Sequence, residues 1–518
     1  MRASWQAGAV GAIAALALAL RLPGLASRSL WLDEAWRANI ALAPSWAAFS
    51  NEVLGGGAPG SIGAPLPPLF ALLLRGLALL VGHSEGGLRA LPLAASVLAV
   101  PLAFLVARRW FGPTAGIAVA LCFACYPAAV FHGQELKQYS LDVLVVLVLL
   151  HLAGLVAERP DSWWRWAYLT LAAVLAPGVS YPAALVLPGV ALGLVAVCRR
   201  ARHLLAWVAA HAIAAGAALT WYLGVIGPQR ARPQVVAYWA ADFAPPGAGP
   251  ATEWAGAQLL ALTAYAFGRP ALLFALVVLI GLVLAPRWGK LTTVGSALTV
   301  LTAAALHLYP LAAGRTSLFL LPFLYLPLAG ALARLGALGG TAGAKQRAIR
   351  TIAIGGALVL LALPARGALR AGLVMEETAP LVRRLAADRQ PTDRVYVYCG
   401  AVPAFHFYHS RMDERVTLGG SHRDESAAYG AELRPILVPG ERLWLLFAHV
   451  VPARDGGSER DVILGELRLY GRQLGAWETE GASLHLFEIT RAPGTVRHIR
   501  IRPEDLRDPE RMRELLGR

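Results

Sequence analysis

The chain has 518 residues, of which 57% are hydrophobic and 15% are charged, and its mean hydropathy is +0.54. This composition excludes an ordinary soluble protein, in which about 25% of residues are charged, and indicates a protein that crosses a membrane several times. The formal net charge of +15 does not indicate a nucleic-acid partner, because the basic residues recur in short clusters between apolar runs. Such clusters are typical of cytoplasmic loops and of contacts with anionic membrane lipid.

Long apolar runs fill the sequence as far as Leu363. A membrane-spanning helix needs about 20 predominantly apolar residues, and we predict eleven spans in a polytopic α-helical membrane domain that comprises residues 1–366. The predicted spans are Ala3–Leu22, Leu88–Ala107, Thr114–Phe131, Tyr139–Ala157, Trp164–Val179, Pro182–Val197, Leu204–Ile226, Ala271–Leu284, Leu291–Tyr309, Thr316–Leu335 and Ile349–Leu363.

The apolar run Pro67–Val81 begins with a double proline, carries Arg75 in its middle, and could either cross the membrane or lie along it. The positive-inside rule separates the two alternatives. If the run does not cross, the later basic clusters fall on the same side as the N-terminus: Arg108-Arg109, Arg199-Arg200, Arg287 with Lys290, and Lys345 with Arg347 and Arg350. We therefore predict an interfacial helix over residues 67–81 and a cytoplasmic N-terminus.

This topology places four connections of the membrane domain outside the cytoplasm. They are the first external loop at residues 23–87, the turn at 132–138, the connection at 227–269 and the turn at 312–315. The part of the chain that follows the eleventh span is expected on the same side.

From about Arg366 the composition becomes polar, with short apolar stretches. Period-two and buried-strand patterns predict strands, and helical spacing predicts helices. The strands are expected over 394–398, 442–447 and 482–489, and the helices over 376–389 and 458–474. We therefore predict a soluble extracytoplasmic α/β domain over residues 367–518.

Asp33 and Glu34 are adjacent carboxylates near the start of the first external loop, within the stretch Arg28–Arg37. One interpretation is a helix N-terminus at the membrane surface, where acidic residues and tryptophan are common. The other is a reaction site, because a carboxylate at a low-dielectric boundary is costly and tends to have a function. An aspartate held beside an acceptor hydroxyl can serve as a general base.

The external turn 132–138 carries a second set of candidates. Glu135, Lys137 and Tyr139 alternate along the sequence, so an extended turn would point them the same way. A solvated turn with a Glu–Lys pair is the alternative. His132 lies near Glu135 and could either ligate a metal or be a hydrogen-bonded turn residue.

Arg315 lies outside the cytoplasm between two predicted spans, where it opposes the positive-inside bias. Its guanidinium group suits phosphate oxygens, and a snorkelling side chain is the alternative. Together, the external carboxylates and cations suggest a pocket for transfer of a group from a phosphorylated lipid. No Walker-type glycine loop, G-x-S-x-G or H-E-x-x-H motif occurs, so an NTPase, a serine hydrolase or a zincin is unsupported.

The order of these motifs resembles the membrane-embedded glycosyltransferases of the C superfamily (GT-C), in particular the glycosyltransferase family 39-like group that contains the protein O-mannosyltransferases and the lipid A aminoarabinose transferase. The resemblance extends from residue 20 to about residue 330. The motifs that carry it are Leu32-Asp33-Glu34-Ala35, Pro67-Pro68-Leu69-Phe70, Leu88-Arg89-Ala90-Leu91-Pro92, Ala107–Gly112, Glu135-Leu136-Lys137-Gln138-Tyr139 and Arg315–Pro322.

The resemblance implies a polyprenyl-phosphate sugar donor and an inverting transfer of a hexosyl or pentosyl group on the external face of the cell membrane. It implies that Asp33, with Glu34 beside it, is catalytic, and that Glu135 and His132 lie near the sugar or a metal. Lys137, Tyr139, Arg315 and Arg89 are expected near the donor phosphate. A divalent metal, Mg²⁺ or Mn²⁺, is left open as a cofactor.

This sequence departs from the family pattern at two positions. Lys137 stands where the family usually has arginine, which removes bidentate phosphate recognition there. Leu66 stands where a histidine or another polar residue usually precedes the double proline.

Two other functional classes are alternatives to an enzyme. A lipid-linked saccharide transporter or flippase would share the basic and aromatic lining, but it predicts ionisable residues within span centres, and no internal repeat supports an inverted-repeat transporter. A non-catalytic scaffold for residues 367–518 is a third possibility. The expected partners are membrane lipid, the donor, and a glycan, lipid or protein acceptor, with no nucleic acid.

Overall fold

The computed structural model describes residues 2–54, 65–230, 238–268, 270–337, 375–409, 412–422, 426–453 and 456–493. The chain divides into two compact units. The first comprises Met1–Arg28 and Arg37–Leu373, and the second comprises Ser29–Trp36 and Val374–Arg518. The predicted span Ile349–Leu363 and the predicted domain boundary at residue 366 lie outside the described residues. Residues 29–36, which the sequence assigned to the membrane domain, belong to the second unit.

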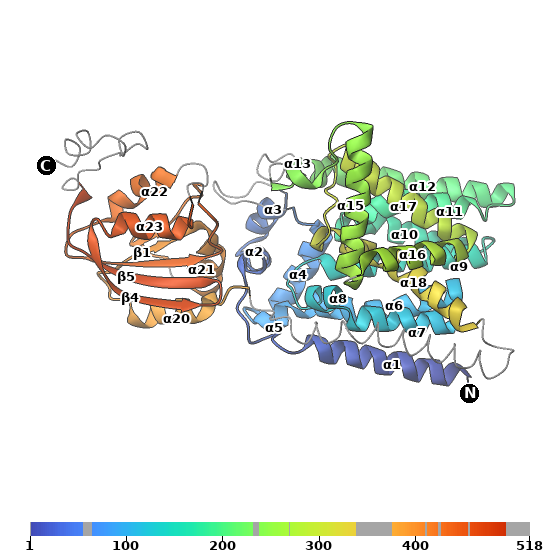
Figure 1. Ribbon diagram of the computed structural model, residues 1–518, viewed down its shortest axis with the longest axis horizontal. Helices are drawn as coiled ribbons and strands as arrows, with labels where there is room; N and C mark the ends of the chain where they lie inside the picture. The colour runs from blue at the N-terminus through green and yellow to red at the C-terminus, as the bar shows by residue number, and fades with distance from the viewer. Residues whose placement is uncertain are drawn as a thin grey trace. The chain divides into compact units, whose positions relative to one another are not determined.

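The first unit is helical throughout its described part (Figure 1). Its α-helices are α1 (Arg2–Arg21), α2 (Leu32–Ala41, shared with the second unit), α3 (Trp46–Leu54), α4 (Pro68–Val81), α5 (Glu85–Leu88), α6 (Ala90–Phe111), α7 (Pro113–Cys125), α8 (Pro127–His132), α9 (Tyr139–Glu158), α10 (Trp163–Val179), α11 (Ala183–Val195), α12 (Ala201–Trp221), α13 (Gly227–Arg230), α15 (Ala248–Phe267), α16 (Ala271–Leu284), α17 (Arg287–Ala305) and α18 (Leu321–Ala337). Shorter turns are the π-helix η1 (Tyr222–Ile226) and the 3₁₀ helices η2 (Ala240–Asp242) and η3 (Arg315–Leu320).

Five helical segments in the described part are long and apolar enough to cross a membrane, or six if the bent pair α15 and α16 forms one span. The five are Ser4–Arg21, Ala90–Phe111, Tyr139–Glu158, Ala201–Arg230 and Arg315–Arg334. The helices α4, α7 and α11 are apolar but shorter. The protein is therefore a multi-helical, multi-pass membrane protein.

The connection predicted over residues 227–269 instead contains the 20-residue helix α15. The sequence analysis missed it because the first two turns of α15 contain Gly249, Pro250 and Glu253, so its continuous apolar part is shorter than a span. The predicted helix over 67–81 is confirmed as α4.

Helices α11 and α17 approach each other closely through small residues. The G-x-x-x-G motif of Gly189 and Gly193 on α11 faces Thr292 and Ser296 on α17: a Cβ atom added at Gly189 would lie 2.2 Å from Ser296 Oγ, and one added at Gly193 would lie 2.0 Å from Thr292 Oγ1. Small residues at such positions let helix backbones approach within a membrane. The two glycines therefore set the separation of this helix pair.

Gly193→Ala is expected to destabilise the first unit by about 1–3 kcal/mol, the usual cost of overpacking a well-packed contact. The matched control is Gly216→Ala on α12, where an added Cβ meets nothing within 4 Å. Thermal unfolding of the purified protein in detergent should show a lower midpoint for the first variant only. Equal midpoints for both variants would contradict the close approach of α11 and α17.

The second unit is built around a five-stranded mixed sheet of order β2-β1-β3-β5-β4. Strand β1 is parallel to β2 and β3, whereas β5 is antiparallel to both β3 and β4. The strands are β1 (Arg394–Val397), β2 (Val416–Leu418), β3 (Arg442–Ala448), β4 (Gly471–Thr479) and β5 (Ala482–Ile489), and the helices are α20 (Thr378–Asp388), α21 (Val402–Tyr408), α22 (Ser426–Leu433) and α23 (Glu459–Leu467), with short 3₁₀ turns η4 (Cys399–Ala401) and η5 (Arg434–Ile436).

Helices cover both faces of this sheet. In Figure 1, α22 and α23 lie on one face and α20 on the other. Leu443, Leu445 and Phe447 of β3 pack in the cluster with α22 and α23, whereas Trp444 and Leu446 pack in the cluster with α20 and α21. A strand buried on both faces has a continuous apolar sequence, which is why β3 could be predicted from the sequence.

The strands predicted over 394–398, 442–447 and 482–489 are confirmed as β1, β3 and β5, and the helix predicted over 376–389 is confirmed as α20. The helix predicted over 458–474 was wrong at its C-terminal end, because α23 stops at Leu467 and β4 begins at Gly471. The capping box formed by Ser458 and Asp461 fixes its start.

A buried carboxylate fastens the start of β3. Asp393 has no exposed side-chain surface, and it accepts hydrogen bonds from Arg442 Nε (2.8 Å), Trp444 Nε1 (2.9 Å) and the backbone N of Gln390 (2.8 Å). Burial alone would raise the pKa of this carboxyl group. The hydrogen bonds from Arg442, Gln390 and Trp444, together with the charge of Arg442, outweigh burial and lower the pKa below its ordinary value.

Candidate active site

The turn between α8 and α9 is fastened to the chain that follows α1. The side-chain amide of Gln134 donates to the carbonyl oxygens of Arg21 (2.9 Å) and Pro23 (3.2 Å), and Arg28 donates to the carbonyl oxygen of Gln134. Gln134 and Arg28 are both buried. Polar contacts therefore hold this turn against the start of the first loop.

Arg21, the last residue of α1, links this helix to α6 and α7. Its guanidinium group has no exposed surface and donates to Ser96 Oγ (2.8 Å) and to the carbonyl oxygens of Phe123 (2.7 Å) and Ala124 (3.0 Å). Both carbonyls belong to the last turn of α7, where intrahelical partners are missing. A cation at this position also complements the helix dipole.

Both ring nitrogens of His132 are engaged. Nδ1 lies 2.5 Å from Glu135 Oε2, and Nε2 lies 2.6 Å from the hydroxyl oxygen of Tyr265. The side chains of His132 and Glu135 are only 5% and 4% exposed, and the ring of Tyr139 meets that of His132 edge-on with centroids 5.4 Å apart. The structure therefore brings His132, Glu135 and Tyr139 together and adds Tyr265, which the sequence analysis missed because it lies in α15.

Tyr265→Phe is expected to destabilise the first unit by about 1–3 kcal/mol, because it leaves the buried Nε2 of His132 without its partner. The matched control is Tyr168→Phe, since Tyr168 is 56% exposed. A lower thermal midpoint for Tyr265→Phe than for Tyr168→Phe is the predicted result. Identical midpoints would mean that the Tyr265 hydroxyl contributes nothing to the cluster.

Lys137 and Arg89 are both buried. The backbone N of Lys137 donates to the carbonyl oxygen of Glu135 at 2.7 Å, which tightens the turn. Arg89, between α5 and α6, donates from Nη1 to the carbonyl oxygens of Leu25 (2.8 Å) and Arg28 (3.0 Å). The Nη1 group of Arg89 thus holds the first loop in place. The assignment of Arg89 to the donor phosphate stays a prediction.

Arg315 is half-buried and begins η3. Its Nη2 donates to the hydroxyl oxygen of Tyr238 at 3.0 Å, and its guanidinium carbon lies 5.8 Å from the ring centroid of Trp239. Because η3 packs against α8 and α9, it joins Arg315 to the elements that carry His132 and Tyr139.

Asp33 and Glu34 form the first turn of α2 and belong to the second unit. Glu34 is fully buried and Asp33 is half-buried. The N-terminus of a helix favours carboxylates through its partial positive charge. The structure therefore has the helix start that was one interpretation of this pair, and the catalytic role of Asp33 and Glu34 stays a prediction.

Among the described residues, no three His, Cys, Asp or Glu side chains come close enough together to hold a metal ion. His132 and Glu135 bind each other, and the second nitrogen of His132 contacts Tyr265. The predicted pair therefore does not fit a metal site as it stands.

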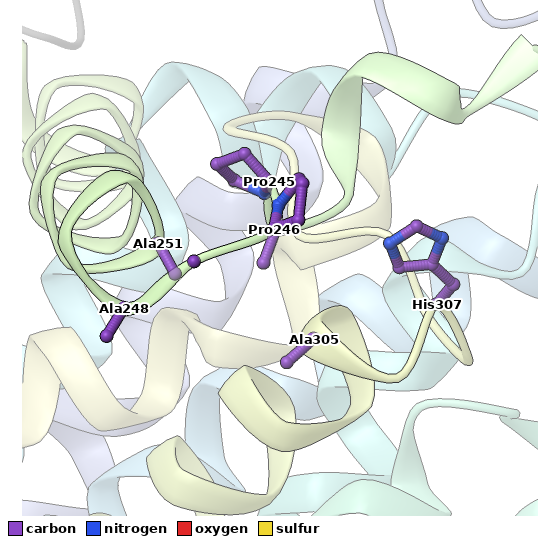
Figure 2. Close-up of a pocket in the computed structure, with 8 residues that line it drawn as sticks. Pro245, Pro246, Ala248, Ala251, Ala305 and His307 are labelled. Atoms are coloured by element: carbon purple, nitrogen blue, oxygen red, sulfur yellow. The ribbon is translucent and has the colours of Figure 1, made fainter.

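A separate pocket lies where the chain enters α15 and leaves α17 (Figure 2). It is lined mainly by alanine and proline, and its residues are Ala244, Pro245, Pro246, Gly247, Ala248, Ala251, Ala305 and His307. His307 has a left-handed backbone (φ 54°) and stacks on Phe243 with ring centroids 4.8 Å apart. None of the predicted site residues lines this pocket.

Comparison with known proteins relates the chain to one family model and to several solved structures. Residues 66–224 match the family model described as dolichyl-phosphate-mannose-protein mannosyltransferase. No significant match to a curated protein was found. The matched range contains Arg89, His132, Glu135, Lys137 and Tyr139.

Solved structures share the fold over nearly the whole chain. The crystal structure of ArnT from Cupriavidus metallidurans bound to undecaprenyl phosphate is 16% identical, with a TM-score of 0.53 over 92% of this chain and 98% of that chain. The archaeal oligosaccharyltransferase AglB from Archaeoglobus fulgidus, in complex with an inhibitory peptide and a dolichol-phosphate, is 11% identical, with a TM-score of 0.53 over 96% of this chain and 75% of that chain. An oligosaccharyltransferase from Archaeoglobus fulgidus in complex with Zn and sulfate is 12% identical, with a TM-score of 0.52 over 94% of this chain and 74% of that chain. At these identities the similarity establishes the fold.

The helical membrane unit, the appended mixed-sheet unit and the family match define a membrane-embedded glycosyltransferase of the GT-C type. More particularly, residues 66–224 match the model of the dolichyl-phosphate-mannose-protein mannosyltransferase family, the group that the sequence motifs resemble. The predicted resemblance to this family and the predicted enzyme class, a glycosyltransferase, are thereby confirmed.

Proposed function

We propose that this glycosyltransferase transfers a hexosyl or pentosyl group, with inversion at the anomeric carbon, from a polyprenyl-phosphate donor to an acceptor on the extracytoplasmic face. The observation that carries the proposal is the family match over residues 66–224, which includes the buried turn with His132, Glu135 and Lys137. A buried cation and a buried carboxylate beside a histidine are suited to a phosphate and a sugar hydroxyl, respectively.

In the proposed reaction, Asp33 takes the proton of an acceptor hydroxyl while the hydroxyl oxygen attacks the anomeric carbon. The bond between that carbon and the phosphate oxygen breaks, and polyprenyl phosphate leaves. A single displacement of this kind inverts the anomeric configuration. Lys137 and Arg315 offset the charge that develops on the leaving phosphate. Glu135 and His132 are assigned to the sugar, and Tyr139 and Arg89 to the donor phosphate.

The proposed topology keeps eleven spans, a cytoplasmic N-terminus and an extracytoplasmic domain at residues 367–518. Helix α4 lies in the membrane interface in this scheme, because Arg75 in its middle donates to the carbonyl oxygens of Ala41 (3.0 Å) and Ala43 (2.9 Å). Its guanidinium carbon also lies 4.7 Å from the ring centroid of Trp46. An arginine used in this way suits a helix that lies at the interface.

The test is turnover by the purified, lipid-reconstituted protein. Radiolabelled polyprenyl-phosphate sugars are offered singly, with a glycan, a lipid and a peptide as acceptors, and release of free polyprenyl phosphate is followed. Release with one donor supports the proposal and identifies the sugar, and the configuration of the product tests inversion. Passage of intact donor between leaflets without release would instead identify a flippase and refute the proposal.

A further inference from the structure

The four residues before Asp33 are held by side chains from the far end of the sequence. Glu377 accepts hydrogen bonds from the backbone N of Ser29 (3.2 Å to Oε1) and from its hydroxyl (2.7 Å to Oε2), and Ser29 Oγ accepts one from the backbone N of Ala379 (3.0 Å). The backbone N of Leu30 donates to the hydroxyl oxygen of Tyr408 at 2.7 Å. All these residues belong to the second unit.

Glu376 contacts the helix that carries Asp33. Its Oε2 accepts a hydrogen bond from the backbone N of Leu32 at 3.0 Å. Leu32 is the first residue of α2, so its N–H has no partner within the helix, and a carboxylate at this end complements the helix dipole. Glu376 is 5% exposed, and its Oε1 lies 2.6 Å from His449 Nδ1. The histidine thus fixes the orientation of the carboxylate that caps α2.

His449 follows the last residue of β3 and has a left-handed backbone, with φ of 51°. This conformation is uncommon for any residue other than glycine, and such outliers gather at functional sites. The ring of His449 lies beside that of Trp31, with centroids 6.2 Å apart. The strained turn therefore presents the imidazole to both Glu376 and the segment before Asp33.

Glu377 is itself fixed by the β4–β5 turn. The backbone N of Glu377 donates to the carbonyl oxygen of Glu480 at 2.7 Å, and Thr479 Oγ1 donates to the carbonyl oxygen of Glu377 at 2.7 Å. The contacts form a continuous chain of hydrogen bonds from the sheet to the start of α2. A mobile surface segment would not supply such fixed acceptors.

We infer that Glu376, Glu377 and His449 are positioning residues for Asp33, which they hold in place through residues 29–32. The inference rests on the proposed function, in which Asp33 is the base. Glu376 and Glu377 contact the backbone before Asp33, and His449 acts through Glu376, so all three act on the rate of the chemical step. A displacement of about 1 Å at a reacting group can lower a rate about 100-fold.

The experiment uses the full-length protein reconstituted in lipid and two variants. The double variant Glu376→Ala/Glu377→Ala removes both carboxylates, and His449→Gly removes the imidazole while relieving the left-handed strain. The control is Glu488→Gln, which changes a carboxylate paired with Arg472 on the exposed edge of the same sheet. Turnover, the KM for the donor and hydrogen–deuterium exchange of residues 29–32 and of β3 are measured for each.

The double variant is expected to lower kcat about 100-fold, and His449→Gly about tenfold, with the donor KM unchanged. Exchange at the amides of Ser29, Leu30 and Leu32 should accelerate while β3 stays protected. Hydrogen exchange separates positioning from folding: in His449→Gly the amides of residues 29–32 should exchange faster and kcat should fall while β3 stays protected. Glu488→Gln should have the kcat, the donor KM and the hydrogen exchange of the wild type.

Unchanged exchange at residues 29–32 in the double variant would overturn the inference, as would faster exchange with wild-type kcat. A comparison with Asp33→Asn distinguishes failure of this inference from failure of the assignment of Asp33 as the base. If Asp33→Asn is inactive while the double variant keeps wild-type kcat, only the inference fails. If Asp33→Asn keeps wild-type turnover, the assignment of the base fails and the inference fails with it.

Discussion

Asp33→Asn is expected to lower the turnover of the reconstituted protein about 10²- to 10⁴-fold, the contribution typical of a general base. Asparagine has nearly the same shape as aspartate but cannot accept the acceptor's proton. It still fits the first turn of α2, where Asp33 is half-buried. Expression, membrane insertion and thermal stability should therefore stay near the wild-type values.

Glu34→Gln is the informative comparison, because Glu34 is the neighbouring carboxylate and is fully buried. Such a position is suited to holding α2 in place more than to meeting an acceptor. We therefore expect Glu34→Gln to lower thermal stability more than Asp33→Asn does, and turnover less. If turnover is lost in Glu34→Gln and retained in Asp33→Asn, the two roles must be exchanged.

Asp393→Ala is expected to destabilise the second unit by about 3 kcal/mol. Removing one partner of a buried ion pair typically costs about 3–5 kcal/mol. We expect the lower end of this energy range because 27% of the Arg442 side chain is exposed, so water can solvate part of its charge. The buried N–H of Trp444 would also lose its acceptor. Thermal unfolding and hydrogen exchange of β1 and β3 in the full-length protein measure the effect.

This destabilisation should depend on pH. The folded-state pKa of Asp393 lies below its ordinary value of about 3.9, so ionisation of this carboxyl group favours the folded state. The contribution is fully present above pH ~4 and is lost as the pH falls through the lowered pKa. The difference in the free energy of unfolding between the wild type and Asp393→Ala should therefore decrease at acidic pH.

The control for Asp393→Ala is Asp413→Ala. Asp413 also pairs with an arginine, Arg389, at 2.9 Å, but half of its side chain is exposed. Exposed pairs contribute about 0–1 kcal/mol. Equal losses from Asp393→Ala and Asp413→Ala would show that burial of the Asp393 carboxylate does not govern its contribution.

Local patterns predicted much of the fold. Strand β5 has the predicted bounds Ala482–Ile489 because it pairs on both sides, and β3 was evident from its apolar run. Strand β2 was missed because it is three residues long and only partly buried. Strand β4 was missed because Gly471 and Gly475 weaken its pattern.

The cluster around His132 was predicted only where its residues are close in sequence. His132, Glu135 and Tyr139 lie within one turn and the start of one helix, so their spacing was visible. Tyr265 carries no local signal, because its role depends on how α15 packs. The contacts of Glu376 and Glu377 with residues 29–32 were equally hidden, since they join residues that are 344 to 348 positions apart.

The same separation sets an order of events during biosynthesis. The segment 29–32 leaves the ribosome long before Glu376, Glu377 and His449 exist, so α2 lacks its side-chain partners while the intervening helices enter the membrane. At about 5–20 residues per second, that interval lasts roughly 20–70 s. A nascent chain that has completed its transmembrane part must therefore still synthesise most of its final third before residues 29–32 can form these hydrogen bonds.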